Sequence, residues 1–564
     1  MAVTHTPLSG SPLGHRALRW FDAWTLGSLV AAAVVATPLI AVFLLALSPQ
    51  DGIWSHLVET VLWEYVGNSL VLVAGVALGT LLLGVGAAWL VTMYAFPGRA
   101  LFEWALLLPL AVPAYVLAFT YTELLEYAGP VQKSLRAFFG WGNARDYWFP
   151  EIRSMGGAIT MMTLVLYPYV YLLTRAAFLA QSVALLEVGR TLGRGPFMTF
   201  RTVALPLARP AIVVGVALAL MEALNDYGTV NYFAVRTLTL GVFNVWFGMS
   251  NLPGAAQIAT VLLGFVVVLI VLERLARRGR RFDNVRSQFR PLPRYPLAGW
   301  RAGAAMLLCL IPILLGFLVP AVELAGFSLV HYEATLQRDF VGFVVNSVGL
   351  SAAAAAVAVG LATVLAYAAR LRRNPILRSA CWVASLGYAM PGAVLAVGVI
   401  VPLTALDHAI DGTMRQVFGI GTGLLITGSV GAIVFGYVAR FLALSYGTME
   451  AGLAKVTPHM DDAARSLGHS PASVLRRVHL PMVRGSALTA ALLVFVDCMK
   501  ELPMTMILRP FNFGTLATFV YQYAGDERLE ECALGALTIV LVGIGPVILL
   551  SSAIRRVRPG TAPD

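Results

Sequence analysis

The stretch Glu187-Val-Gly-Arg-Thr-Leu-Gly193, followed by nine residues and by Val203-Ala-Leu-Pro206, interrupts an otherwise apolar region of the sequence. The same pattern returns 275 positions later as Asp462-Ala-Ala-Arg-Ser-Leu-Gly468, nine residues and Val478-His-Leu-Pro481. Each copy predicts a short helix and a turn, because small residues allow backbones to approach closely and proline fits the start of a helix but not its interior. Two copies with identical spacing indicate that the chain is an internal duplication.

Composition places most of this sequence in a lipid bilayer. Of the 564 residues, 59% are hydrophobic and 12% are charged, whereas a soluble globular protein has about 25% charged residues. The net charge of +11 comes largely from arginines in short loops between apolar runs, which fits the positive-inside rule better than a nucleic-acid-binding surface. The cysteines show no disulfide or zinc pattern, since all lie in or beside apolar segments: Cys309, Cys381, Cys498 and Cys532. Residues 1–20 lack a signal-peptide pattern, so we expect the first apolar run to remain as a membrane anchor.

Twelve apolar runs are long enough to cross a bilayer as helices. Backbone groups in lipid must be hydrogen-bonded within the segment, and the sequence lacks the alternation of a barrel strand. The predicted fold class is therefore an all-α polytopic membrane protein. The predicted spans are 24–48, 67–94, 101–121, 156–176, 208–225, 255–275, 303–326, 343–369, 379–405, 421–445, 486–508 and 532–553.

The two halves of the sequence share one plan. Asn68-Ser69, Pro113 and Thr237-Leu238 recur as Asn346-Ser347, Pro391 and Thr515-Leu516, with a shift of 278 residues. Both halves begin on the same side of the membrane, so we predict two parallel six-helix repeats related by an axis along the membrane normal. The predicted boundaries are a tail at 1–23, a first half at 24–275 with its signature loop at 181–206, a linker at 276–302, a second half at 303–553 with its loop at 455–481, and a tail at 554–564.

The distribution of arginine predicts which side of the membrane each loop faces. The linker and the end of the span before it carry nine arginines, Arg274 among them, against Asp283 and Glu273, and the prolines of the linker favour an extended tether. The C-terminal tail adds three arginines, and the loop 371–378 adds three more. All of these fall on one side if both termini are cytoplasmic, which leaves the loop 122–153, with balanced charges, on the outside.

The duplicated signature resembles the EAA loop of the permeases of bacterial ABC importers, which are inner-membrane proteins with the MetI-like permease fold. The resemblance implies that each copy docks in a groove on one subunit of a cytoplasmic ATPase dimer, whose closure rocks the two halves. The residues implied to couple to the ATPase are Glu187, Gly189, Gly193, Leu205, Pro206, Asp462, Ala463, Ala464, Gly468, Leu480 and Pro481. The copies depart from the family pattern, since the first has Val188-Gly189 in place of two alanines and the second has Asp462 in place of glutamate.

Ionisable side chains inside predicted spans form a second group of candidate site residues. They are Glu222, Asp226, Asp497, Lys500 and Glu501. The two carboxylates of each half are four residues apart, which places them on one helix face. Ionisable groups at membrane depth are costly, so they mark either a translocation pathway between the halves or a structural network of lysine and carboxylates, and both interpretations remain open. Gly228 and Pro503 follow directly and predict a break in each helix.

The segments around these ionisable residues make the family resemblance more specific. The stretches 221–233, Met499-Lys-Glu-Leu-Pro503, Leu508-Arg-Pro-Phe-Asn-Phe513 and Asp526-Glu-Arg-Leu-Glu530 look like the fused permeases of bacterial ferric-iron importers, and the resemblance extends over residues 20–555. It implies ferric iron as the cargo, with thiamine, phosphonate or a polyamine as alternatives. In this family the external binding protein coordinates the iron, so a dedicated ferric site inside the membrane is not expected.

The sequence does not predict an enzyme. It lacks GxxxxGK[ST], so we expect no cofactor in this chain, with ATP and Mg²⁺ bound by a separate ATPase subunit. The other expected partners are a periplasmic or lipid-anchored substrate-binding protein and the lipid bilayer. An ion-coupled secondary transporter, whose carboxylates would carry protons, and a membrane receptor or scaffold are the rival functions. Neither rival gives the two matched signatures a role.

Overall fold

The computed structural model describes residues 23–48, 52–179, 181, 195–277, 294–336, 339–371, 374–454 and 456–555. Within these ranges, eleven helices are long and apolar enough to cross a membrane. A further pair of helical segments, Arg99–Ala111 and Ala114–Phe139, meets at an angle of 91° and makes a twelfth span if it is counted as one. The predicted all-α polytopic fold is therefore confirmed.

The elements of the first half alternate long spans with short segments. They are α2 (Ala23–Ala46), α3 (Ile53–Thr60), α4 (Leu62–Met93), β1 (Tyr94–Ala95), α5 (Arg99–Ala105), the 3-10 helix η1 (Leu108–Ala111), α6 (Ala114–Leu125), α7 (Pro130–Phe139), α8 (Met155–Leu179), α10 (Pro196–Thr199), the π-helix η2 (Phe200–Ala204), α11 (Leu205–Asn225), α12 (Gly228–Tyr232), α13 (Leu238–Phe243), the π-helix η3 (Asn244–Gly248) and α14 (Leu252–Arg277).

The second half has the same sequence of long spans and helix breaks, with different short elements between them. Its elements are β2 (Tyr295–Pro296), α15 (Trp300–Ile313), the π-helix η4 (Leu314–Leu318), α16 (Val319–Leu336), α17 (Phe340–Leu371), α18 (Pro375–Ala384), the 3-10 helix η5 (Ser385–Ala389), α19 (Gly392–Phe418), α20 (Val430–Ala454), α21 (Pro458–Ser466), α22 (Pro471–Val474), the π-helix η6 (Leu475–His479), α23 (Leu480–Met499), α24 (Pro503–Leu508), α25 (Leu516–Gly525) and α26 (Leu529–Arg555). β1 and β2 pair in parallel and join the two halves at one end of the molecule.

Identical hydrogen bonds in the two halves confirm the duplication. The Asn68 side chain donates to the carbonyl of Arg236, and the Asn346 side chain donates to that of Gly514. In each half the neighbouring serine hydroxyl then accepts from the backbone N–H of the leucine that begins α13 or α25. The residues that form these bonds are the ones that recur at a shift of 278. In each half they attach the second span to the short helix α13 or α25.

Two of the predicted spans are broken at the repeated prolines. η1 ends just before Pro113 and α6 begins just after it, and η5, Pro391 and α19 repeat this arrangement. Each proline has the extended backbone conformation of a helix N-cap, with ψ of 141°. Proline disfavours helical conformation in the preceding residue, which separates the two segments. The predicted span 421–445 also starts later than expected, at Val430.

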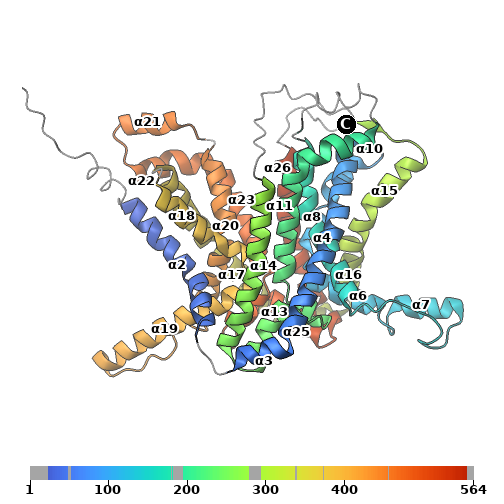
Figure 1. The fold of residues 1–564 in the computed structure, drawn as a ribbon, viewed down its shortest axis with the longest axis horizontal. Helices are drawn as coiled ribbons and strands as arrows, with labels where there is room; N and C mark the ends of the chain where they lie inside the picture. The colour runs from blue at the N-terminus through green and yellow to red at the C-terminus, as the bar shows by residue number, and fades with distance from the viewer. Residues whose placement is uncertain are drawn as a thin grey trace, which may run out of the picture.

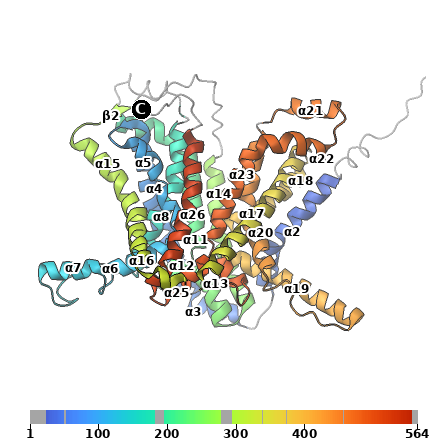
Figure 2. The ribbon, with the colours of Figure 1, turned by 180° about the vertical axis from the view of Figure 1, so that it is seen from behind.

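The first span of each half packs against the other half. α2 contacts α17, α18 and α19, and its Ala32 is buried in one cluster with Leu365 of α17. In return, α15 contacts α4 and α5, and its Cys309 is buried in one cluster with Phe102. Figures 1 and 2 show α2 and α15 on opposite sides of the bundle, each beside helices of the other half.

The short helices gather at the two ends of the bundle. α10, α21 and α22 lie at one end, whereas α3, α13 and α25 lie at the opposite end (Figure 1). The described parts of the two signatures therefore share one end of the molecule, although 275 residues separate the two copies in the chain.

Candidate functional site

Two helix breaks, one in each half, line the same cavity. α11 ends at Asn225 and α12 begins at Gly228, while α23 ends at Met499 and α24 begins at Pro503. The predicted breaks are thus present in both halves. In the first half, the Asp226 carboxylate accepts hydrogen bonds from the backbone N–H groups of Thr229 (2.9 Å) and Val230 (3.3 Å). These bonds satisfy donors that a helix N-terminus leaves free, so Asp226 caps the start of α12.

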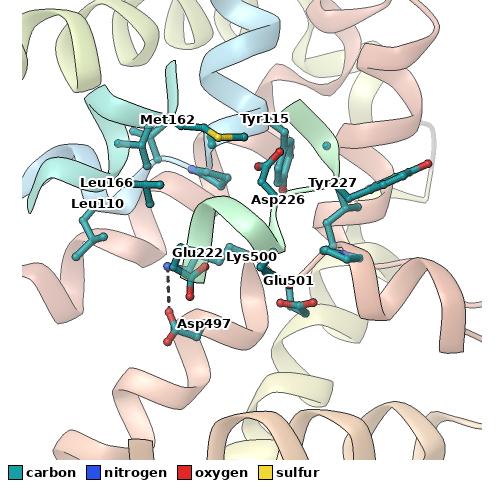
Figure 3. Close-up of a pocket in the computed structure, with 18 of the residues that line it drawn as sticks. Leu110, Tyr115, Met162, Leu166, Glu222, Asp226, Tyr227, Asp497, Lys500 and Glu501 are labelled. Atoms are coloured by element: carbon teal, nitrogen blue, oxygen red, sulfur yellow. Dashed lines mark ion pairs between the residues drawn. The ribbon is translucent and has the colours of Figure 1, made fainter. Parts of the chain in front are cut away.

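A cavity of about 80 Å³ lies between these breaks (Figure 3). Its charged lining residues include all five predicted in the spans: Glu222, Asp226, Asp497, Lys500 and Glu501. Both halves contribute to its wall, because α11 and the break after it supply the first two, and α23 and the break after it supply the others. The structure therefore brings together residues that are 275 positions apart.

Two ion pairs lie in the part of the cavity wall that the second half contributes. Lys500 Nζ lies 3.0 Å from Asp497 Oδ1, and Figure 3 shows the Glu222 side chain beside this pair. Arg440 of α20 lies 3.0 Å from Glu501 Oε2. The side chains of the Arg440–Glu501 pair are only 3% and 4% exposed, so each charge depends on the other for its stability at this depth.

Asn225 connects the two halves at this point. Its side-chain oxygen accepts a hydrogen bond from Arg440 Nη1 (2.9 Å) and another from the backbone N–H of Gly392. A Cβ atom on Gly392 would lie 2.5 Å from both Arg440 Nη1 and Glu501 Oε1. Glycine at 392 therefore allows the first turn of α19 to approach the buried ion pair.

The cavity has an excess of negative charge. Four carboxylates and two cationic side chains line it, which leaves a net formal charge of −2. Glu222 has no hydrogen bond or ion pair to any other residue in the part of the chain that the structure describes. The hydroxyl of Tyr115, another lining residue, is buried without a hydrogen-bond partner among the described residues. Unpaired oxygen donors in a negative cavity are suited to a passing cation.

Sequence reasoning missed three residues of this wall: Tyr115, Asn225 and Arg440. Arg440 had a readable signal, because it is a charged residue in the apolar stretch of α20 and such a residue is expected to have a buried partner. Asn225 occupies the position equivalent to Lys500 at the shift of 275. Comparison of the repeats could have marked this pair as a difference between the halves.

The predicted coupling residues of the second signature lie at one end of the bundle and just inside it. Asp462, Ala463 and Ala464 lie on α21, and Leu480 and Pro481 begin α23. Gly468 has a φ of +79° and open space around its α-carbon, a backbone conformation that other residues adopt only with strain. In the first signature, Leu205 and Pro206 begin α11, whereas Glu187, Gly189 and Gly193 lie outside the described residues.

A charged network attaches α21 to the span α17. Asp461 of α21 lies 2.9 Å from Arg370 Nη2 and 2.5 Å from His479 Nε2. Arg370 also donates to the backbone carbonyls of Leu453 and Val456, so it closes the segment between α20 and α21. His479 belongs to the second signature and is fully buried.

The first half does not have the charged residues that form this network. At the repeat shifts of 278 and 275, Arg370 corresponds to Thr92 and His479 corresponds to Ala204. In place of charges, Trp89 packs edge-on against Phe178 with ring centroids 5.4 Å apart. The charged network of the second half therefore has no counterpart at these two positions of the first half.

We expect Arg370→Met to loosen α21 without unfolding the bundle. Hydrogen bonds that involve a charged group contribute about 1.5–3 kcal/mol, so the backbone amides of α21 should exchange with solvent roughly 10- to 100-fold faster. Hydrogen-exchange mass spectrometry of the purified protein measures this, with the amides of α23 as an internal reference. Arg477→Met, at an exposed arginine of the same region, is the matched control, and equal exchange in both variants would contradict the assigned role of Arg370.

Comparison with known proteins agrees with this geometry. Residues 80–281 and 358–561 each match the family described as binding-protein-dependent transport system inner membrane component. The chain is 27% identical to the Fe(3+)-transport system permease protein FbpB 2 of Haemophilus influenzae, over 86% of this chain and 89% of that protein. It is 26% identical to the probable ABC transporter permease protein y4fN of Sinorhizobium fredii, over 92% of each. A shorter relative, the molybdenum transport system permease protein ModB of Escherichia coli, is 28% identical over 39% of this chain and 95% of its own length.

Proposed function

The chain belongs to the family of binding-protein-dependent transport system inner membrane components, with two copies of the family domain, and on this premise we propose that it imports a multivalent cation, ferric iron. In this proposal the chain is the multi-pass permease subunit of an ATP-driven importer in the bacterial inner membrane. Both halves enclose one pathway, and the cavity between the two helix breaks lies on it.

The charge of the cavity is the observation that carries the choice of cargo. A net formal charge of −2 attracts a cation and repels an oxyanion such as molybdate, sulfate or a phosphonate, and these interactions are strong where protein shields them from water. The volume of about 80 Å³ suits a small ion with a few water molecules, because one water needs roughly 10–15 Å³ of such space. An extended polyamine or thiamine would need a wider cavity than this conformation provides.

The name of one relative supports the same choice. The Haemophilus protein, which covers 86% of this chain, is named as a permease for Fe(3+). The ion-coupled secondary transporter remains the rival from another class, since it would use Asp226 and Glu501 as proton carriers. In the structure these two carboxylates cap α12 and pair with Arg440, which gives both of them a structural role.

Energy for transport would come from a separate ATPase dimer. We propose that its two subunits bind the first and second signatures at the end of the bundle that carries α10 and α21. This end would face the cytoplasm with both termini, and the substrate-binding protein would dock at the opposite end. Closure of the ATPase dimer would then move both coupling segments and switch access to the cavity from one end to the other.

The test is uptake of radiolabelled ferric iron by cells that express this chain with its ATPase and binding protein. We expect uptake by the wild type and its loss when Gly193 and Gly468 are both replaced by leucine, because a side chain strains the positive φ of Gly468 and blocks the docking surface. Oxyanion uptake with no iron uptake would contradict the proposed cargo. Iron uptake that continues without ATP would instead support the secondary transporter.

A further inference from the structure

Each half projects an arm beyond the bundle at the end opposite the coupling segments. The first arm is residues 126–153, which include α7, and the second arm is residues 400–429, which include the C-terminal part of α19. Each follows the helix that begins at the repeated proline, and each leads directly into the next span, α8 or α20. Figures 1 and 2 show the arms running sideways, across the direction of the spans, and pointing away from each other.

Internal hydrogen bonds give the second arm a defined shape. The Asp407 carboxylate accepts from the backbone N–H groups of Leu425, Ile426 and Thr427. One turn further along, Asp411 accepts from the backbone N–H groups at 422 and 423. These two carboxylates attach residues 422–427 to α19. The second arm is therefore a hairpin with a defined structure.

The first arm is held by a different set of contacts. The Tyr147 hydroxyl donates to Gln132 of α7 and accepts from Arg136 of α7 (3.0 Å). Trp141 stacks on the Tyr147 ring, with centroids 4.6 Å apart and planes 9° apart. The Asp146 carboxylate accepts from two backbone N–H groups and closes the turn after α7. This arm too has a fixed shape of its own.

Both arms expose large apolar side chains beside charged ones. In the first arm, Phe138 is 82% exposed and Trp148 is 86% exposed. In the second arm, Leu406 and Val417 are exposed on one side of α19, and Leu403 and Ile410 continue the same stripe at helical spacing. Exposed apolar surface on this scale needs a partner.

Neither water nor the hydrocarbon core of a bilayer suits such arms. Phe138, Trp148 and Val417 disfavour full exposure to water, whereas the charges of the arms disfavour the bilayer core, where ionisable groups are costly. The charged residues are Glu126, Lys133, Arg136, Arg145, Asp146, Glu151, Arg153, Asp407, Asp411 and Arg415. The boundary between headgroups and acyl chains accommodates both kinds of side chain, and amphipathic helices lie there in the plane of the membrane.

We propose that the two arms lie on the outer leaflet of the membrane, with Phe138, Trp148 and Val417 inserted among the lipids. The arms point in opposite directions from the bundle (Figures 1 and 2), so a single protein docked over the central cavity would not cover both tips. A lipid surface is the partner that reaches both arms at once.

The test uses single-cysteine variants of the full chain in nanodiscs of phosphatidylethanolamine and phosphatidylglycerol. All four native cysteines are buried, so a fluorescent NBD label reacts selectively at an introduced one. Phe138→Cys and Val417→Cys report on the apolar sides of the arms, while Lys133→Cys and Gln416→Cys are the matched controls on the neighbouring polar sides. Each labelled protein is first required to elute as a single species in size-exclusion chromatography.

Two quenchers then distinguish lipid from water. We expect lipids with a spin label near the headgroup to quench NBD at 138 and 417 several-fold more than at 133 and 416, and aqueous iodide to show the reverse order. Equal access of iodide to all four positions would overturn the proposal. Protection of 138 and 417 that appears only after addition of the substrate-binding protein would also overturn it and would assign the arms to protein docking.

Discussion

Replacing Glu222 with glutamine should lower cation uptake by more than roughly 100-fold while the protein still folds. At an effective dielectric constant of about 20, a unit charge roughly 6 Å from a trivalent cation contributes several kcal/mol to its binding. Glu222 forms no hydrogen bond or ion pair with the described residues, and Lys500, beside which it lies, keeps its ion pair with Asp497 at 3.0 Å, so the variant should still fold. Uptake of ferric iron into proteoliposomes that contain the ATPase and the binding protein measures the effect.

Glu59→Gln provides the matched control for this experiment. Glu59 lies on α3 and is exposed, so the substitution removes the same charge outside the cavity and should leave uptake unchanged. Thermal unfolding of Glu222→Gln should match that of the wild type, which separates a transport defect from a folding defect. Wild-type uptake in Glu222→Gln would remove the cavity from the pathway and favour the structural interpretation of its carboxylates.

Replacing Glu501 with glutamine should destabilise the protein severely. The Arg440 guanidinium is almost completely buried against Glu501, and removal of one partner from such a pair costs about 3–5 kcal/mol because the remaining charge stays uncompensated. We expect a clear fall in the unfolding temperature of the purified protein and a lower yield of folded protein from the membrane. Arg440→Met should have a similar effect, because it leaves the Glu501 carboxylate buried without a counter-charge.

The double variant Arg440→Met with Glu501→Leu tests this explanation. Apolar residues in place of a buried ion pair are often tolerated, so most of the lost stability should return. The double variant also keeps the net formal charge of the cavity at −2, since one positive and one negative side chain are lost together. Cation uptake should therefore recover with stability, and a stable double variant without uptake would show that Arg440 or Glu501 has a direct part in transport.

The repeated residues made much of this fold predictable. Spans were recognisable because apolar runs of that length have one stable conformation in lipid, and the pairs recognised at a shift of 278 include Ser69 and Ser347, which make equivalent hydrogen bonds in the structure. The five ionisable residues in the spans were also predicted, and all of them line one cavity. Their roles in transport stay predictions.

Other features depended on contacts that spacing does not reveal. Pro113 and Pro391 were recognised as repeats, yet the sharp bends that they introduce depend on packing around the broken helices. Local pattern also could not show that α2 packs against the opposite half, because hydropathy describes the length of a span and not its neighbours. Arg440 was overlooked as a partner for Glu501, since the two residues lie 61 positions apart on different spans.

The two halves contribute different charges to the cavity wall, and this difference suggests a reason for their fusion in one polypeptide. The described lining residues of the first half contribute two carboxylates and no cation, whereas the second half contributes two carboxylates and two cations. A pore made from two copies of the first half would thus have a formal charge of −4, and one made from two copies of the second would be neutral. Translation as one chain fixes the stoichiometry at one of each, and the exchanged first spans favour correct pairing over either homodimer. Duplication followed by divergence has in this way produced an intermediate charge that neither half could supply alone.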